Sequence, residues 1–265
     1  MKINALYYLE LIKHPHRILK FISGFRAVGG YCTICGKSTF FLIIRGVLRG
    51  NYLCVNCHSR SRNRYLAKVL CDIFAIKKPY SLGNFIRSLP DLSVYEAQAS
   101  GVIHDKLKFL NNYSCSEFFN DITPGSFSSN GTLCQDLQNL SFRDNSFDLV
   151  ITQDVFEHIR DPEIAWREIY RVLKPGGYHV FTIPWSRDHK TVRRVRLEGE
   201  NEVYILPKVF HGDDIRDGLV YSDFGYDIPE ALNTMGFPTE VYYNNYQESK
   251  LYRIYDSCVF VSGKM

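Results

Sequence analysis

The sequence lacks a long uninterrupted apolar segment. In its 265 residues no apolar run approaches the ~18 that a membrane-spanning helix needs, so we expect no transmembrane segment. The N-terminus also lacks a basic start before an apolar core, and no small-residue cleavage site follows, so we expect no signal peptide. We therefore expect a cytoplasmic protein.

A strong charge of either sign is also missing. The formal net charge is +4 and the isoelectric point is near 8.5. Such a mildly basic balance does not by itself imply a nucleic-acid partner. Hydrophobic residues make up 45% of the chain, which is ample for a core, and the length allows one large or two small domains.

Residues 1–28 have the pattern of a short amphipathic helical arm. Apolar side chains such as Leu9, Leu11 and Ile12 alternate with charged ones. The arm could make a weak peripheral contact with an anionic membrane surface, or it could pack on its own protein, which is the commoner role. The basic residues available for the first role are Lys13, Arg17, Lys20 and Arg26.

Four of the eight cysteines form two close pairs. Their pattern, Cys32-x2-Cys35-x18-Cys54-x2-Cys57, is typical of a four-cysteine zinc ribbon. Each pair places two thiolates at one turn, and Zn²⁺ held by four of them has no open position. We therefore predict a structural zinc ion within residues 29–80, a segment that comprises the ribbon and a following helix. Disulfide bonds are the alternative explanation.

Three arginines follow the second cysteine pair. Arg60, Arg62 and Arg64 precede a helix whose apolar positions recur at helical spacing from Leu66 to Phe74. Guanidinium groups suit phosphate oxygens, so the arginines could clamp a phosphate or a nucleic-acid backbone. They could equally pair with acidic residues of the main domain, and the sequence leaves both roles open.

A strand–helix–strand unit occupies residues 134–185. The β-branched run Asp148–Thr152 is typical of a buried parallel strand. Asp161-Pro162 begins a helix as N-cap and first residue, and Pro175-Gly176-Gly177 is expected to end it. Val180–Ile183 forms the next strand. Such a unit is typical of a doubly wound α/β sheet.

This unit resembles the second half of a class I S-adenosylmethionine-dependent methyltransferase domain. The resemblance implies an α/β fold over residues 90–265, with a Rossmann-like, doubly wound, seven-stranded methyltransferase sheet behind the zinc ribbon. It also implies that Glu240–Tyr243 and Cys258–Val261 pair as the last two strands, one of them reversed. The matching elements are Gln135-Asp136-Leu137, Phe142 to Asp148, Glu157-His158 and Arg171 to Gly177.

The resemblance assigns residues to S-adenosylmethionine as the cofactor. Glu96 ends a short strand, and the turn after it is glycine-rich in the family, whereas only Gly101 remains here. Glu117 follows the second strand, where a carboxylate can accept hydrogen bonds from both ribose hydroxyls. The remaining predicted cofactor contacts are Gln98 and Ser100 in the turn, Gln135, Asp136 and Leu137 near the adenine, and Gln153, Asp154 and Val155 near the sulfonium.

The segment 185–229 is too long for a plain connection, so we expect it to form a lid over the substrate. His211 lies beside two acids in this segment and could take a proton from a hydroxyl acceptor. His158 is a second candidate base, although a histidine that opens a helix is more often a structural or capping group.

The mechanism implied by the resemblance is direct displacement of the sulfonium methyl group by the acceptor. We expect a small-molecule or saccharide-like acceptor, because the predicted lid is rich in histidine, arginine and tyrosine. One alternative is a ribosomal RNA methyltransferase, and another is a nucleic-acid-binding module with an inactive fold. The mild charge and the absence of interleaved aromatic and basic residues weigh against both. The sequence does not indicate an oligomeric state.

Overall fold

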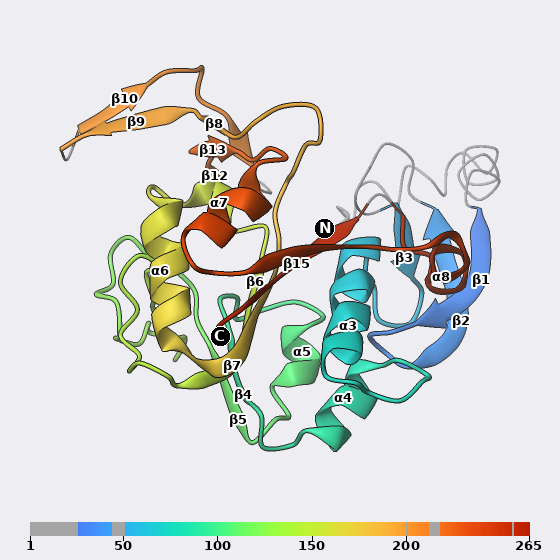
Figure 1. The fold of residues 1–265 in the computed structure, drawn as a ribbon. Coiled ribbons are helices and arrows are strands. Elements are labelled where there is room, and N and C mark those ends of the chain that lie inside the picture. The colour runs from blue at the N-terminus through green and yellow to red at the C-terminus, as the bar shows by residue number, and fades with distance from the viewer. Residues whose placement is uncertain (1–25, 44–50, 200, 212–217, 256) are drawn as a thin grey trace, which may run out of the picture.

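The structure is a computed structural model that describes residues 26–43, 51–199, 201–211, 218–255 and 257–265. Its main sheet has the strand order β14-β15-β7-β6-β4-β5 (Figure 1). The strands are β4 (Ser93–Glu96), β5 (Asn112–Cys115), β6 (Phe147–Gln153), β7 (Leu173–Thr182), β14 (Thr239–Tyr243) and β15 (Cys258–Gly263). β5, β4, β6 and β7 are parallel, whereas β15 is antiparallel to both of its neighbours. The predicted α/β sheet with one reversed strand is therefore confirmed.

The sheet has six strands in the part of the chain that the structure describes, whereas the resemblance implies seven. Beyond the end of β5, a single parallel bridge joins Glu117 to Cys134 where a seventh strand would pair. The segment between them contains Pro124, and Gly125 and Gly131 adopt φ angles of +88° and +81°. These residues turn the connection between Glu117 and Cys134, and among the described residues the seventh strand is reduced to this single bridge.

Helices cover both faces of the sheet. α6 (Pro162–Val172) and α7 (Ile228–Thr234) pack on one face, and α3 (Ser61–Ile73), α4 (Leu82–Ser88) and α5 (His104–Leu107) cover the other (Figure 1). α6 begins as predicted, because the Asp161 side chain accepts a hydrogen bond from Glu163 N over 3.2 Å. The helix ends earlier than predicted, since Leu173 already pairs with Phe147 in the sheet.

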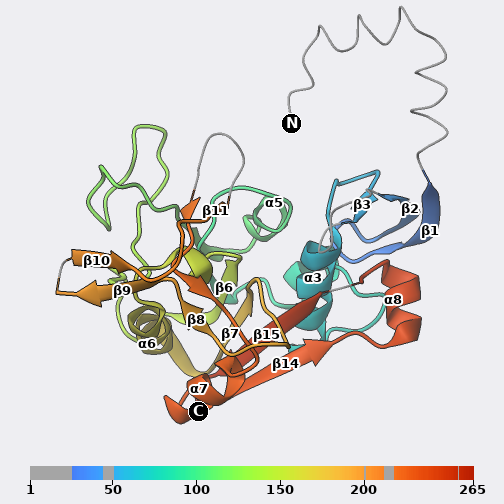
Figure 2. The same ribbon diagram turned by 90° about the horizontal axis from the view of Figure 1, so that it is seen from above.

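The ribbon is a small antiparallel sheet of β1 (Ala27–Cys32), β2 (Lys37–Ile43) and β3 (Tyr52–Cys54). It lies beside α3 and α8 (Tyr246–Tyr252) in both ribbon views (Figures 1 and 2). Cys32 and Phe41 belong to the same buried cluster as Val94 and Val180 of the main sheet, so ribbon and sheet share one core.

The predicted N-terminal arm is only partly described. Ala27 and Val28 pair with Leu42 and Phe41 in the ribbon, so these two residues belong to a strand and not to a helical arm. Residues 1–25 lie outside the described residues.

The segment predicted to be a lid folds into short antiparallel pairs. β9 (Val195–Glu198) pairs with β10 (Asn201–Tyr204), β8 (Val192–Arg193) with β13 (Ser222–Asp223), and β11 (Phe210–His211) with β12 (Gly218–Leu219). The β9–β10 hairpin projects from the body of the molecule (Figure 1). Within the described ranges, no helix combines the length and apolar character needed to cross a membrane.

Candidate functional site

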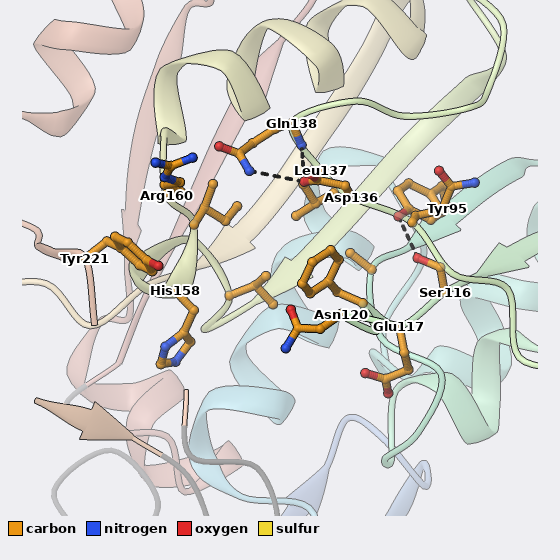
Figure 3. Close-up of a pocket in the computed structure, with 15 residues that line it drawn as sticks. Tyr95, Ser116, Glu117, Asn120, Asp136, Leu137, Gln138, His158, Arg160 and Tyr221 are labelled. Carbon is orange, nitrogen blue, oxygen red and sulfur yellow. Dashed lines mark hydrogen bonds between the residues drawn. The ribbon is translucent and has the colours of Figure 1, made fainter. Parts of the chain in front are cut away.

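A cavity of about 600 Å³ opens at the carboxyl ends of β4, β5 and β6 (Figure 3). Doubly wound sheets bind ligands at this edge, because the loops that follow parallel strands converge there. The wall draws on segments far apart in the sequence. They are Tyr95 and Ala97, Ser116 to Phe118 with Asn120, Gln135 to Gln138, Val155 with His158 to Arg160, and Tyr221.

Glu117 lies in the cavity wall just after β5. Its Oε1 accepts a hydrogen bond from Ala99 N over 3.2 Å, which ties the turn after β4 to the end of β5. Figure 3 shows Glu117 and Asn120 on the same side of the cavity. This position suits a carboxylate that accepts from a ribose, which remains a prediction.

Glu96, another predicted cofactor contact, lies behind the turn and does not line the cavity. It is 1% exposed, its Oε2 lies 2.7 Å from the donating Tyr113 hydroxyl, and its Oε1 lies 3.1 Å from Gln153 Nε2. Burial raises the pKa of Glu96 to about 8, so its carboxyl group keeps its proton at neutral pH. Glu96 therefore supports the turn from within.

The turn after Glu96 reaches the cavity through Ala97, whereas Gln98, Ser100 and Gly101 do not line it. Gly101 has a φ angle of +99°, a conformation that favours glycine. Gln98 Oε1 accepts a hydrogen bond from Gln153 Nε2 over 3.4 Å. The turn is thus tied to the end of β6 as well as to Glu117.

Gln135, Asp136 and Leu137 all line the cavity, as the resemblance implies. The Gln135 amide is engaged internally, since it donates to Ser141 Oγ over 2.6 Å and accepts from Ser141 N over 3.0 Å. Asp136 Oδ1 accepts from Gln138 N over 2.8 Å, which fixes its carboxylate at the wall. Asp136 is therefore better placed than Gln135 to accept from a ligand.

Val155 lines the cavity, but Gln153 and Asp154 face the start of α3. Asp154 Oδ2 lies 2.6 Å from Arg62 Nη1, and its Oδ1 accepts from the Thr182 hydroxyl over 3.0 Å. Asp154 also adopts a φ angle of +50°, which aspartate tolerates better than most residues. The ribbon helix thus contacts the strand end where sulfonium and acceptor are predicted to meet.

His158 ends a short 3₁₀ helix and lines the cavity (Figure 3). Its Nδ1 lies 3.0 Å from the carbonyl oxygen of Leu219 in the predicted lid. Because a carbonyl oxygen only accepts, Nδ1 carries the proton. In the neutral ring Nε2 then holds the lone pair that a general base needs.

Two further side chains line the same end of the cavity. The Tyr221 hydroxyl donates to Glu202 Oε1 over 2.8 Å, and Arg160 Nε lies 3.3 Å from the same oxygen. Glu202 belongs to β10, so the projecting hairpin is anchored to the cavity wall.

His211, the other candidate base, is the last residue of β11 and pairs with Gly218 through the backbone. The acids next to it, Asp213 and Asp214, lie outside the described residues. The role of His211 stays a prediction.

Sequence reasoning missed several residues of the wall, among them Phe118, Asn120 and Arg160. Phe118 and Asn120 follow Glu117 closely, and this adjacency to a predicted ribose contact was an available signal. Arg160 follows the candidate base His158 by two residues, so the same signal was available, whereas its contact with Glu202 arises only from tertiary folding.

The four paired cysteines come together as predicted. Their Sγ atoms all lie within 4.8 Å of one another, with 3.6 Å between Cys32 and Cys57 and 4.0 Å between Cys35 and Cys54. Sulfurs placed tetrahedrally ~2.3 Å from Zn²⁺ are about 3.8 Å apart, so the donor set fits this ion.

The state of these cysteines also fits a metal site. All eight cysteines of the chain are free, so the disulfide alternative is wrong. Burial and the neighbouring sulfurs raise the pKa of Cys35 to about 11, so a nearby cation would be needed to hold its thiolate at neutral pH.

The three arginines after the ribbon serve mainly internal contacts. Arg62 pairs with Asp154, as one of the two interpretations predicted. Arg64 is fully buried and donates to the carbonyl oxygens of Ser59, Tyr252 and Arg253 over 2.5, 3.0 and 2.6 Å. A phosphate clamp made of all three arginines is therefore excluded.

Comparison with known proteins points to one family. Residues 117–181 match the family model described as a methyltransferase domain. The chain is 30% identical over 105 residues to 24-methylenesterol C-methyltransferase 2 of Arabidopsis thaliana, covering 40% of this chain and 27% of that protein. It is 38% identical over 68 residues to glycine/sarcosine/dimethylglycine N-methyltransferase of Actinopolyspora halophila, covering 26% and 10%.

The matched region is a part of these proteins. The chain spans about a quarter or less of the length of the sterol and glycine methyltransferases that it matches. Among solved structures, an S-adenosylmethionine-dependent methyltransferase from Mesorhizobium loti covers 69% of this chain and 95% of its own, with 15% identity and a TM-score of 0.43.

Proposed function

We propose that this chain, which contains a class I S-adenosylmethionine-dependent methyltransferase domain, transfers the methyl group of S-adenosylmethionine to a small-molecule acceptor. The observation that carries the proposal is the cavity at the carboxyl ends of β4, β5 and β6. It brings together Glu117, Asp136 and Val155, which the resemblance assigned to the ribose, adenine and sulfonium ends of one cofactor. Residues from three separate segments of the chain thus line one cavity, as binding of a single ligand would require.

The residues in the wall fit S-adenosylmethionine chemically. Glu117 and Asp136 offer carboxylate acceptors for ribose hydroxyls and an adenine amino group. Phe118 and Leu137 also line the cavity and provide apolar surface. When bound, the cofactor supplies an activated methyl group. The protein then needs mainly to hold and orient the two reactants and to exclude water.

The protein's own contribution to the reaction is positioning. Val155 and His158 lie next to each other in the wall after β6, where the acceptor would approach. With Nδ1 donating to the Leu219 carbonyl, the His158 ring is held with Nε2 as its basic nitrogen. His158 would then take the proton of a hydroxyl acceptor, and His211 is the second candidate for this step.

A small-molecule acceptor is favoured over nucleic acid. The named relatives include methyltransferases of sterols, glycine and phosphoethanolamine. Two of the three arginines that could have held a phosphate backbone are engaged within the chain. A saccharide-like acceptor remains our specific hypothesis, because the predicted lid is rich in histidine, arginine and tyrosine and its Tyr221 lines the cavity together with His158.

We also propose that Cys32, Cys35, Cys54 and Cys57 hold one structural Zn²⁺. The support is the closeness of their four sulfurs, since four thiolates complete the tetrahedral shell of a structural Zn²⁺. The metal would stabilise the ribbon, and it takes no part in methyl transfer.

Two measurements test the proposed activity. Titration with S-adenosylhomocysteine by calorimetry should show one site per chain, and absence of binding would overturn the proposal. Transfer of a labelled methyl group should then appear in the small-molecule fraction of a cell extract. Label found only in the RNA fraction, with binding that weakens steeply with salt, would favour the ribosomal RNA alternative.

A further inference from the structure

We propose that Asn63, near the start of α3, positions the turn Ala97 to Gly101 through Gln153. This is the turn after β4 that the resemblance assigns to the cofactor. The inference rests on the proposed function, since the turn is assigned to S-adenosylmethionine. It starts from an unusual feature of this chain, which retains only Gly101 in a turn that is glycine-rich in the family. The side chains that stand in place of glycine can themselves make hydrogen bonds that hold this turn, as Gln98 does.

Those contacts form a directed series of hydrogen bonds. The backbone N–H of Arg60 donates to Asn63 Oδ1 over 3.1 Å. Asn63 Nδ2 donates to Gln153 Oε1 over 3.1 Å. Gln153 Nε2 then donates to Glu96 Oε1 over 3.1 Å and to Gln98 Oε1 over 3.4 Å. The series therefore runs from the start of α3 to Glu96, the last residue of β4, and to Gln98 in the turn that follows it.

The direction of this series is fixed at its origin. An amide side chain can be rotated to exchange its oxygen and nitrogen, but a backbone N–H can only donate. Arg60 N therefore forces the Asn63 oxygen toward itself, which turns the Asn63 nitrogen toward Gln153. Gln153 must then present its nitrogen to Glu96 and Gln98. Asn63 and Glu96 thus hold the Gln153 amide from its two ends, the first donating to its oxygen and the second accepting from its nitrogen.

The series begins close to the cysteine cluster. Arg60 follows Cys57 by three residues, and the Ser59 hydroxyl between them lies 3.2 Å from Cys57 Sγ and 3.3 Å from Cys32 Sγ. The geometry of the ribbon thus determines where α3 begins. The first residues of α3 in turn determine which way the side-chain amide of Gln153 is oriented. On its other side the turn is held by Glu117, which accepts from Ala99 N.

Asn63→Asp tests the proposal with little change in the helix. Aspartate keeps the Oδ1 acceptor for Arg60 N but loses the Nδ2 donor to Gln153. We expect affinity for S-adenosylhomocysteine to fall by about three- to tenfold, as for one lost hydrogen bond, while the thermal unfolding midpoint stays near that of the wild type. Asn84→Asp, the same change in α4 away from the cavity, should leave the affinity unchanged.

A double-mutant cycle separates positioning from a general structural effect. Gln153→Met should weaken S-adenosylhomocysteine binding by a similar factor, and adding Asn63→Asp to it should cause no further loss. Additive losses would overturn the series, and so would unchanged affinity in Asn63→Asp. If the wild type itself fails to bind S-adenosylhomocysteine, the proposed function falls and this inference falls with it, which is a different and recognisable result.

Discussion

Arg62 and Asp154 are 92 positions apart in the chain, yet Nη1 of the first lies 2.6 Å from Oδ2 of the second. The pair joins the helix after the ribbon to the residue that follows β6. The Asp154 side chain is 14% exposed and the Arg62 side chain 37%. Because the carboxylate is the more buried partner, its charge depends on this arginine for compensation.

Removing the arginine should therefore destabilise the protein. We expect Arg62→Ala to lower the free energy of unfolding by about 1–3 kcal/mol, since a largely buried carboxylate loses the guanidinium group that it contacts at 2.6 Å. The matched control is Arg196→Ala, because the Arg196–Glu198 pair is 62% and 56% exposed and should contribute less than about 0.5 kcal/mol. Urea unfolding measures both variants. Equal losses in the two would show that the pair between ribbon and sheet has no special role.

The cysteine cluster leads to a prediction about metal content. Purified protein should contain one Zn²⁺ per chain, and Cys54→Ser should release it and loosen the ribbon, because three thiolates bind the ion less tightly than four. Metal analysis and thermal unfolding measure the two effects. Cys115→Ser, which alters a cysteine outside the cluster, should retain the ion. Stoichiometric zinc in a Cys54/Cys57 double variant would exclude this ligand set.

Glu117 should contribute strongly to cofactor binding. Glu117→Ala removes a carboxylate at the position of the ribose, and loss of charge-assisted hydrogen bonds should weaken S-adenosylhomocysteine binding by about 1–3 kcal/mol. Glu240→Gln removes an exposed carboxylate from β14, far from the cavity wall, and should leave the affinity unchanged. Calorimetry compares the two. Wild-type affinity in Glu117→Ala would place the ribose elsewhere.

The raised pKa of Glu96 predicts how the free energy of unfolding depends on pH. Its folded pKa of about 8 lies above the unfolded value of ~4.3, so between these values the folded chain holds a proton that the unfolded chain has released. This contribution to stability is complete below about pH 4 and is lost as the pH rises to about 8, with a slope of at most ~1.4 kcal/mol per pH unit. Tyr113, Asp105 and Glu117 are the titratable neighbours.

Glu96→Gln isolates this effect, because glutamine has no proton to lose. The difference in unfolding free energy between the variant and the wild type should shift in favour of the variant as the pH rises from 5 to 8. Chemical unfolding at several pH values measures it. A difference that is constant with pH would mean that Glu96 ionises normally in the folded protein.

The sequence predicted the architecture where the pattern was local. Asp161-Pro162 marked the start of α6, the cysteine spacing marked the ribbon, and the run Asp148–Thr152 marked β6, because each feature depends on neighbouring residues. Glu117 and Val155 were predicted site residues because they follow strands, whereas Gln135 to Leu137 were assigned by the resemblance and His158 was a candidate base. All of them line the cavity.

The rest depends on contacts between distant segments. The sequence assigned Glu96 to the cofactor, but its burial against Tyr113 and Gln153 follows from packing of three strands. It left Arg62 undecided between phosphate and a carboxylate, since the approach of α3 to Asp154 is a tertiary property. It also implied a seventh strand, which in the described residues is reduced to a single bridge between Glu117 and Cys134.

The last prediction concerns the candidate base. His158 lines the cavity with Nδ1 donating to the Leu219 carbonyl, so His158→Ala should lower kcat by about 10²–10⁴-fold for a hydroxyl acceptor, because proton removal is lost. Affinity for S-adenosylhomocysteine should change much less. In the wild type the rate should fall at low pH through one ionisation, and this limb should vanish in the variant.

His211→Ala is the comparison that decides between the two histidines. If His158 is the base, His211→Ala should keep a near-normal kcat and its acidic limb, and any defect should appear as a higher KM. If His211 is the base, His211→Ala should instead lose kcat and the acidic limb, and His158→Ala should keep both. Methyl transfer to any acceptor identified in the extract, measured from pH 5 to 9, distinguishes them. A wild-type kcat in both variants would show that the acceptor needs no base, as expected for an already nucleophilic amine or thiolate.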